Sequence, residues 1–480
     1  MHTIPLIIRG RVIRDDLVTH GGRRGGLRFQ TPDVGAHVRS LPLRDPGGLG
    51  DLYGLRMSEI LDYLDELSGR LSPGDNPHVQ QALEISSAVS GMGEPILARM
   101  YEGIRNLLCR DRVEEIVGTN IGIPFLEGWV PLHVAGRQAE VRAFGARTVH
   151  VNAGNGVAIA LQSVLVNAVL RSDAIVKSPS NDPFTATAIA LTMIDMAPDH
   201  PLTLHLSVAY WPGGDDTVEN VLYRPTNIDK IIAWGGAASM RHIRARLRPG
   251  IDLIAMDPKN SVSIIGPEVL ADEVALHTAA ELLARDVGYF NQEGCANSRV
   301  AYLLSGTDEP GVKQAVRFGE LVHAAVQALP PDLSTPHPAF DPALRDELAG
   351  VRLSQSHHVI GGRAAEGGVV VSLDEEPVDF AERLGGRVVN VVPVDGIEDV
   401  LPHLTVHTQT VGVYPDRLLV DIRDECARRG VQRLCTLGYA CSMGLAQPHD
   451  AMEPMRRMVR WIVSETYPDT TVAGSGLGFG

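Results

Sequence analysis

The sequence predicts an α/β protein that is divided into at least two domains. Between residues 145 and 260, apolar runs typical of buried strands alternate with runs whose spacing is typical of helices. A second alternating series covers residues 261–440. Alternation of this kind predicts mainly parallel, twisted sheets with helices on both faces. The length of 480 residues also exceeds what one hydrophobic core usually serves.

Charge, cysteine content and hydropathy restrict the class of protein. The formal net charge of -15 argues against a general affinity for nucleic acid or acidic lipid. The 5 cysteines are an odd number without a CxxC pair, so their spacing predicts neither a disulfide framework nor a zinc site. No apolar run reaches the length of a membrane span, and the N-terminal run is too short for a signal peptide. We therefore expect a cytoplasmic globular protein.

The segments before residue 152 are of three kinds. Residues 1–50 are rich in Arg and Gly and predict short strands and loops. Residues 57–120 have the apolar spacing of helices, as in Ile60, Leu61, Leu64 and Leu67. Residues 122–152 contain short alternating runs that predict strands.

The first alternating series follows. It begins with TVHVNAGN, which predicts a strand and a turn, and its further predicted strands are DAIVKSPS, LTLHLSVAY, KIIAWGG and IDLIAM. Its predicted helices are GVAIALQSVLVNAVLRS, PFTATAIALTMIDMA and ASMRHIRARLR. A parallel sheet of this type binds ligands at the carboxyl ends of its strands. Those ends carry the segments VNAGN, VKSPS and AWGG, where we expect a ligand site.

The chain after residue 260 completes the predicted organisation. We expect an N-terminal region and a cofactor-binding domain in residues 1–260, with its core at about 145–260, and a catalytic domain in residues 261–440. Residues 441–480 predict a tail for packing or oligomerisation. Within it PMRRMVRWIVSETY predicts a helix, and the Gly-rich VAGSGLGFG predicts a mobile end.

One cysteine lies in a predicted turn. The segment FNQEGCANSRV places Cys295 after Gln, Glu and Gly and before a polar run. A cysteine in such a turn can be a reactive nucleophile, but free cysteines are more often small buried hydrophobic residues. The local pattern leaves both interpretations open.

The other local signals are equally open when taken singly. AGNGVA opens a predicted helix after a strand, which favours an anion or oxyanion site there, but a plain tight turn has the same pattern. Lys177 at a strand end can be a ligand or a solvated terminus. His357 and His358 have no further ligand at metal spacing. His449 and Asp450 are adjacent in sequence, which predicts that their side chains point apart, and we expect them to cap the last helix.

The order of these motifs carries more information than any one of them. VNAGN, IVKSPSNDP, IIAWGGAAS, IAMDPKN and NQEGCANSR occur in the order that resembles the aldehyde dehydrogenase superfamily. Within it the chain is similar to the acyl-CoA reductase (LuxC-type) family, the long-chain fatty-acid reductases, also through RVVNVVPVDGIEDVL and QTVGVYP. The resemblance implies an aldehyde-dehydrogenase-like fold with a Rossmann-type cofactor domain, an α/β catalytic domain and a small oligomerisation element.

The resemblance also implies roles for individual residues. It places Cys295 at the nucleophile, whose thiolate accepts and then releases an acyl group. It places Asn155 at the asparagine that stabilises the oxyanion, with Asn152 as the competing candidate. Lys177 matches the lysine that binds the adenosine ribose.

Three more positions concern the cofactor. Gly235 and Gly236 match the turn at the pyrophosphate, and Ser180 falls near the position where many NAD-preferring members carry a glutamate. An acid there would repel a 2′-phosphate, so its absence is compatible with NADPH, although NADH stays possible. The spacing of the cysteines and histidines predicts no metal site. The equivalence of Glu382 to the glutamate that binds the nicotinamide ribose stays open.

A departure from the family pattern bears on the reaction. Aldehyde-oxidising members carry ELGGK, whose glutamate activates the hydrolytic water; with Lys259 on that lysine, Ala255 takes the glutamate's place. This favours NADPH-dependent reduction of an acyl thioester to an aldehyde through Cys295. The alternatives are an NAD(P)-dependent aldehyde dehydrogenase, a cofactor-free cysteine hydrolase or acyltransferase, and a non-catalytic carrier.

The expected partners follow from the same resemblance. The acyl donor is either acyl-CoA or an acyl-carrier protein, and the sequence does not separate them or reveal the acyl chain. A homodimer or homotetramer, formed through a β-hairpin and the C-terminal tail, is implied, and an acyl-activating partner protein is possible.

Overall fold

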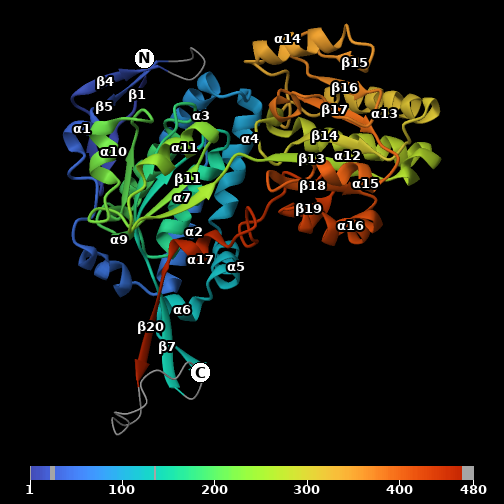
Figure 1. The fold of residues 1–480 in the computed structure, drawn as a ribbon. Coiled ribbons are helices and arrows are strands. Elements are labelled where there is room, and N and C mark those ends of the chain that lie inside the picture. Colours follow the sequence, from blue (N-terminus) through green and yellow to red (C-terminus); the bar gives the residue numbers. More distant parts are fainter. Residues whose placement is uncertain (1, 22–27, 135–136, 467–480) are drawn as a thin grey trace.

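The computed structural model describes residues 2–21, 28–134 and 137–466. Two α/β bodies lie side by side, and a narrow arm of strands projects from the first of them (Figure 1). Each body is built on a seven-stranded sheet, and two three-stranded sheets complete the described part of the chain.

The first body contains the predicted parallel sheet. Its strands β8, β9, β10, β11 and β12 pair in parallel, and β2 and β3 extend it antiparallel beside β10. The order across the sheet is β12 (Asp252–Met256), β11 (Lys230–Trp234), β8 (Arg147–Val151), β9 (Asp173–Lys177), β10 (Leu206–Ala209), β2 (Leu6–Ile8) and β3 (Arg11–Ile13). The N-terminal strands β1 (His2–Thr3), β5 (Phe29–Pro32) and β4 (Leu17–His20) form a separate small sheet.

Helices cover both faces of this sheet, because each face has its own apolar core. One core is shared by α2 (Met57–Arg70), α3 (Pro77–Val89), α4 (Glu94–Ile104), α5 (Arg110–Asn120), α7 (Val157–Val169) and α8 (Thr185–Met196). The other is shared by α1 (Val34–His37), α10 (Asp216–Leu222) and α11 (Ala237–Arg246). The sheet is therefore enclosed, and its strand ends remain as the place for a ligand.

One predicted strand of this series is shorter than expected. The segment LTLHLSVAY begins as a short helix, α9 (Pro201–Leu204), and only its second half forms β10. His200 caps the helix by accepting a hydrogen bond from Leu202 N at 3.2 Å, and Pro201 occupies the first turn, where its fixed φ favours a helix. These capping signals override the β propensity of the segment.

The second body has the same layered design. Its sheet has the order β15 (His357–Gly361), β16 (Gly368–Ser372), β17 (Val388–Pro393), β14 (Ser298–Leu303), β13 (Asn260–Ile265), β18 (Thr408–Tyr414) and β19 (Arg433–Thr436). Only the β15–β16 pair is antiparallel. One face packs against α12 (Glu273–Gly288) and α13 (Glu309–Gln327), and the other against α15 (Ile397–Val400) and α16 (Asp416–Arg428). The helix α14 (Pro342–Val351) packs in a satellite core.

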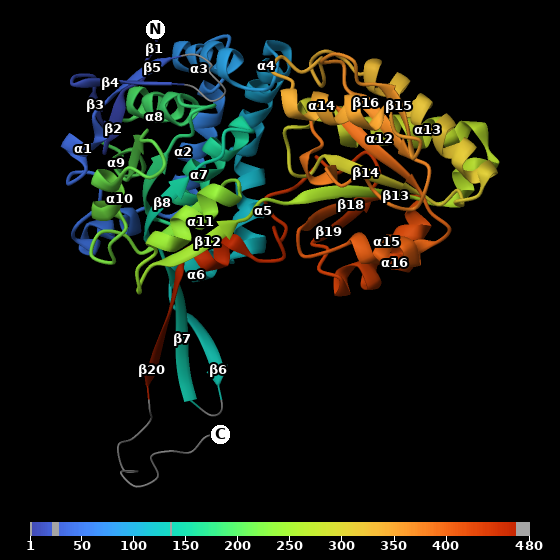
Figure 2. The same ribbon diagram turned by 45° about the horizontal axis from the view of Figure 1, so that its top comes forward.

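The projecting arm corrects the prediction for the C-terminal segment. PMRRMVRWIVSETY was predicted to be one helix, but it forms the short helix α17 (Pro454–Met458) and the strand β20 (Arg460–Thr466). Strand β20 pairs antiparallel with β7 (Arg137–Phe144), which pairs with β6 (Val130–Val134) (Figure 2). The β-branched run of this segment and a full ladder with β7 favour the strand. The Gly-rich end that was predicted to be mobile, VAGSGLGFG, lies outside the described residues.

No helix in the described ranges is long and apolar enough to cross a membrane.

Candidate active site

The loop that carries Cys295 has an unusual backbone. Between α12 and β14, the consecutive residues Phe290, Asn291 and Gln292 have φ values of 55°, 54° and 63°. Left-handed backbone is costly for residues with side chains, and such conformations persist where the surroundings hold them. The strain ends just before Cys295, which lies in a turn, as the sequence predicts.

Buried amide side chains hold this loop in place. Gln292 Nε2 donates to Ser298 O and to Val388 O, both at 2.8 Å, and its Oε1 accepts from Val388 N at 2.8 Å. Asn297 Oδ1 accepts from Gly294 N at 3.0 Å. Ser261 Oγ donates to Cys295 O at 2.8 Å. The thiol is therefore fixed to the sheet of the second body.

Two cavities of different character meet at Cys295. The first, called here the apolar cavity, has a volume of about 260 Å³. The second, called here the polar cavity, has a volume of about 360 Å³. Only a few residues line both of them: Asn155, Ile159, Trp234 and Cys295. The thiol therefore faces two compartments that could hold two different ligands.

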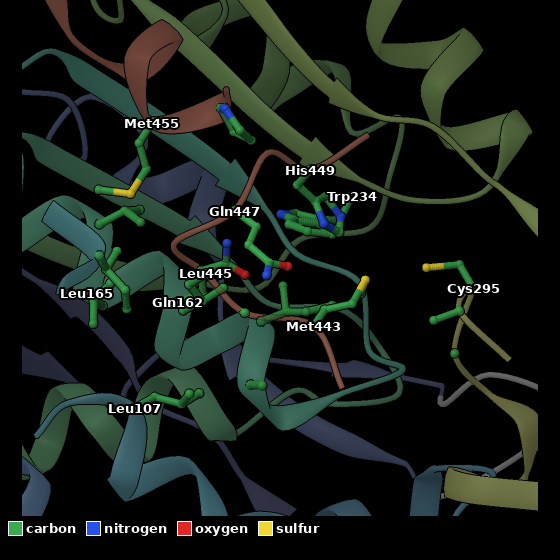
Figure 3. A pocket seen from close by; sticks show the side chains of 18 of the residues that line it. Leu107, Gln162, Leu165, Trp234, Cys295, Met443, Leu445, Gln447, His449 and Met455 are labelled. Atoms are coloured by element: carbon green, nitrogen blue, oxygen red, sulfur yellow. The ribbon is translucent and has the colours of Figure 1, made fainter. Parts of the chain in front are cut away.

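The apolar cavity lies between the first body and the segment that follows β19. Figure 3 shows Cys295 and Met443 at one end of it, and Leu107, Leu165 and Met455 toward the other. Its walls come mainly from α5, α7, α17 and residues 441–449: Leu107, Ile116, Asn120, Ala158, Gln162, Leu165, Val166, Phe290, Met443, Leu445, Gln447, Met455 and Met458. Flexible methionines and aliphatic side chains suit an apolar chain of variable shape.

The polar cavity contains the glycines that the resemblance implicated. Gly235 and Gly236 follow β11, and Gly236 is the N-cap of α11. A Cβ at Gly236 would meet no atom within 4 Å, so open space lies before this helix N-terminus. A helix N-terminus with free backbone N–H groups favours an anion such as a pyrophosphate. The buried Oε1 of Gln409, another wall residue, has no hydrogen-bond partner in the structure and could accept from a ligand.

The structure distinguishes the two candidate asparagines. Asn155 lines both cavities, its Nδ2 donates to Glu293 O at 3.1 Å, and its buried Oδ1 has no partner. Asn152 lines neither cavity, and its Oδ1 accepts from Ser163 Oγ at 2.9 Å. Asn155 is thus the asparagine beside the cysteine loop.

Lys177 and Ser180 lie farther along the same sheet edge. Lys177 ends β9, and Ser180 follows in the next turn; neither lines the apolar or the polar cavity. The Lys177 ammonium lies 5.4 Å from the ring centroid of Trp211. Burial lowers the pKa of Lys177 to about 8, against an opposing effect of the Glu219 carboxylate. A fixed cation at this edge is suited to the distal part of a long ligand.

The environment of Cys295 controls its ionisation. Burial raises the pKa of the Cys295 thiol above its ordinary value, and the Asp450 carboxylate raises it further. A hydrogen bond from Gln409 and the Arg299 guanidinium act in the opposite direction. The thiol is therefore protonated at neutral pH when no ligand fills the cavities.

His449 and Asp450 differ from the prediction. Their side chains do not point apart: His449 Nε2 lies 3.6 Å from Asp450 Oδ1. They also do not cap α17, whose N-cap is Glu453 without a side-chain hydrogen bond. A tight turn, in which His449 and Met452 exchange two backbone hydrogen bonds at 2.9 and 3.0 Å, brings the two side chains together. His449 lines the apolar cavity and Asp450 the polar cavity.

Sequence reasoning did not find Gln409, Asp450 or Trp234 as site residues. Gln409 stands in the segment QTVGVYP and Trp234 in AWGG, so the motifs were noticed but not these side chains. The available signal for Gln409 was an amide side chain at the start of the run QTVGVY. For the metal question, the described ranges hold no group of three His, Cys, Asp or Glu side chains that could bind an ion.

Comparison with known proteins gives a family match over most of the chain. The model of the family described as acyl-CoA reductase (LuxC) matches residues 52–461. A long-chain acyl-protein thioester reductase of Photorhabdus laumondii is 27% identical over 420 residues, which are 86% of this chain and 82% of that protein. The protein of the same name from Vibrio harveyi is 26% identical over 471 residues, covering 96% and 93%.

Solved structures show the fold. Aldehyde dehydrogenase 21 from Physcomitrella patens superposes with a TM-score of 0.73 at 13% identity, covering 98% of this chain and 99% of that one. An aldehyde dehydrogenase from Mycobacterium tuberculosis, complexed with NAD+, gives a TM-score of 0.73 at 15% identity, covering 96% and 98%. The NADP-dependent glyceraldehyde-3-phosphate dehydrogenase of Bacillus halodurans gives 0.72 at 12%, covering 97% and 99%. The expected aldehyde-dehydrogenase-like fold is confirmed.

Proposed function

We propose a function that starts from the family of this chain: it belongs to the acyl-CoA reductase (LuxC) family, whose model matches residues 52–461. The proposed activity is the NADPH-dependent reduction of an acyl thioester to the aldehyde through an acyl-enzyme on Cys295. The observation that carries this proposal is the position of Cys295 between an apolar and a polar cavity. One can hold an acyl chain and the other a nicotinamide cofactor, with the thiol between them.

In the proposed acylation, Cys295 attacks the thioester carbonyl carbon. The new C–S bond forms, the bond to the donor thiol breaks, and the thiol proton of Cys295 passes to the departing thiolate. Asn155 Nδ2 and the Cys295 N–H are the donors for the developing oxyanion. Because Asn155 already donates to the loop that carries the cysteine, its amide needs little movement to serve.

The residues present fit a nicotinamide cofactor in the polar cavity. Gly235 and Gly236 at the start of α11 would receive the pyrophosphate, and Lys177, which lies outside this cavity at the same sheet edge, would face the adenosine ribose. A bound NADPH would supply the hydride that reduces the acyl carbon. Collapse of the resulting thiohemiacetal on Cys295 then breaks the C–S bond and releases the aldehyde, and the Cys295 sulfur regains a proton. The absence of an acid at Ser180 supports NADPH over NADH.

The polar cavity also bears on the competing oxidation reaction. Ala255, at the position of the glutamate in ELGGK, lies in β12 and lines neither cavity. Because an alanine cannot take a proton from an attacking water, position 255 does not supply the glutamate's role, which favours persistence of the thioester for reduction. This supports a reductase over an aldehyde oxidase. The printed names of the relatives, acyl-protein thioester reductases, support an acyl-protein donor beside acyl-CoA.

The test is NADPH consumption and aldehyde formation with panels of acyl-CoAs and acyl-carrier proteins. We expect Cys295→Ala to lower kcat/KM by roughly 10⁴-fold or more, because the nucleophile is lost. Cys435→Ala is the matched control, since this half-buried cysteine lies in β19 and lines neither cavity. Full activity of Cys295→Ala would refute the acyl-enzyme, and sustained conversion of free aldehyde to acid would favour the oxidase.

A further inference from the structure

Asp450 reaches the candidate site from a segment that belongs to neither large sheet. After β19 the chain returns from the second body to α17 beside the first (Figure 1). In this segment Asp450 and Ala451 have φ values of 52° and 57°. Two successive left-handed residues that are not glycine are costly. This strained backbone places the Asp450 side chain, which is 4% exposed, in the wall of the polar cavity.

The contacts of Asp450 lead directly to the thiol. Gln409 Nε2 donates to Asp450 Oδ1 at 3.0 Å. Gln409 and Cys295 line the same polar cavity, and the Gln409 side chain lowers the pKa of the Cys295 thiol, as expected of an amide donor that faces the sulfur. An amide nitrogen has two hydrogens, so one can face the carboxylate while the other faces sulfur. The loop after α12, strand β18 and the C-terminal segment thus meet in a chain of three side chains.

Besides Asp450, four charged side chains line the polar cavity. Arg299 and Lys259 are the cations in the wall of the polar cavity, while Glu293 pairs with His337 at 2.8 Å. Asp257, also in this wall, is held by Arg244 through two hydrogen bonds of 2.8 and 3.0 Å.

The neighbouring imidazole leaves the charge of Asp450 in place. Burial lowers the pKa of His449 by more than the adjacent Asp450 carboxylate raises it. The ring is therefore neutral at neutral pH, although its Nε2 lies 3.6 Å from the carboxylate.

We infer that Asp450 is a positioning residue for Cys295, acting through the Gln409 amide. The inference rests on the proposed function, in which Cys295 is the nucleophile. The carboxylate orients the amide so that an N–H faces the sulfur, and its negative charge opposes ionisation of the thiol while the cavities are empty. Gln409 Oε1, which has no partner, remains available to a ligand, so ligand binding can shift this balance.

The experiment measures the rate at which iodoacetamide alkylates Cys295 as a function of pH, resolved by mass spectrometry. It uses the full chain without cofactor or acyl donor. Asp450→Asn removes the charge but keeps an acceptor for Gln409, so its alkylation midpoint should move to lower pH. Gln409→Leu removes the donor, so its midpoint should move to higher pH. A decrease of one pKa unit gives about tenfold more thiolate at a pH below the midpoint.

Controls separate this inference from general damage and from the proposed function. Glu453→Gln changes an acid of the same segment that lines neither cavity, and it should leave the profile unchanged. Alkylation of Cys435 in the same samples reports folding. An unchanged profile in folded Asp450→Asn would overturn the inference, as would a Cys295 that resists alkylation at every pH. Neither measurement requires turnover. Retention of reductase activity by Cys295→Ala, which would refute the proposed function, is therefore detected in a separate assay.

Discussion

Asn155 and Asn152 show how much a single residue's role depends on the fold around it. They lie three positions apart, and the sequence left both as candidates for the oxyanion donor. The start of α7 places Asn155 against the backbone of the cysteine loop, whereas Asn152 is used inside the first body by Ser163. A separation of three residues therefore decides which of the two side chains lines the cavities.

This division can be measured. Asn155→Ala should lower kcat for thioester reduction by about 10²–10³-fold, because one donor to the oxyanion is lost, with little change in KM. Asn152→Ala is the matched control: it removes a buried acceptor and should cost about 1–3 kcal/mol of unfolding free energy with kcat largely retained. Steady-state kinetics and thermal unfolding of both variants check this. A larger loss of kcat in Asn152→Ala would reverse the assignment.

The sequence predicted the residues that sit in ordered motifs and missed those that meet only in space. Cys295, Gly235 and Gly236 were singled out because the order of their motifs resembles a known family, and all three line the polar cavity. Gln409 and Asp450 come from distant segments, and nothing local in either segment shows that both face the same thiol. The left-handed turn at Asp450 and Ala451 contains no glycine, so the sequence does not indicate a turn there.

At the scale of elements, α7 links the two halves of the candidate site. Its N-terminus follows the Asn155 loop, and its side chains Ala158, Gln162 and Leu165 continue along the wall of the apolar cavity. The sequence predicted this helix from its apolar spacing. It could not predict that one side of an almost wholly apolar helix borders a cavity, because buried and cavity-lining faces have the same composition.

The apolar cavity should therefore limit the length of the acyl chain. Ala158→Phe places a large ring in the wall, so long acyl donors should lose kcat/KM while short ones are retained. Burial of each methylene stabilises binding by about 0.8 kcal/mol, or about fourfold, so the loss should grow by that factor for each excluded carbon. Ala158→Ser is the control of similar size. Kinetics over a series of saturated acyl-CoAs give the test, and a uniform loss at every chain length would contradict it.

At the scale of the whole molecule, the two α/β bodies and the strands in residues 122–152 were predictable, and the C-terminal strand of the arm was not. Alternating strands and helices predict enclosed parallel sheets, because each element needs partners of the same series. Strand β20 instead depends on β7, which lies more than 300 residues away in the chain. The local sequence RWIVSET does not indicate that it pairs with β7, so a helix was predicted there.

The arm has one apolar face. In the register of β20, β7 and β6, Val463 lies opposite Val141, which lies opposite Val130, and Leu132 lies on the same face because the side chains alternate. Val463 is 54% exposed and Leu132 is 46% exposed. An apolar face on a projecting sheet is typical of a surface that another chain covers. We expect it to pack against a second copy of the protein.

Two substitutions on opposite faces of β20 test this self-association. Val463→Asp puts a charge into the apolar face and should convert the assembly to monomers, because an unpaired carboxylate cannot be buried cheaply. Ser464→Asp puts the same charge on the other face of the same strand and should leave the assembly intact. Light scattering coupled to size exclusion measures the mass of each variant. A monomeric wild type, or dissociation by both variants alike, would mean that the apolar face is not the contact between copies.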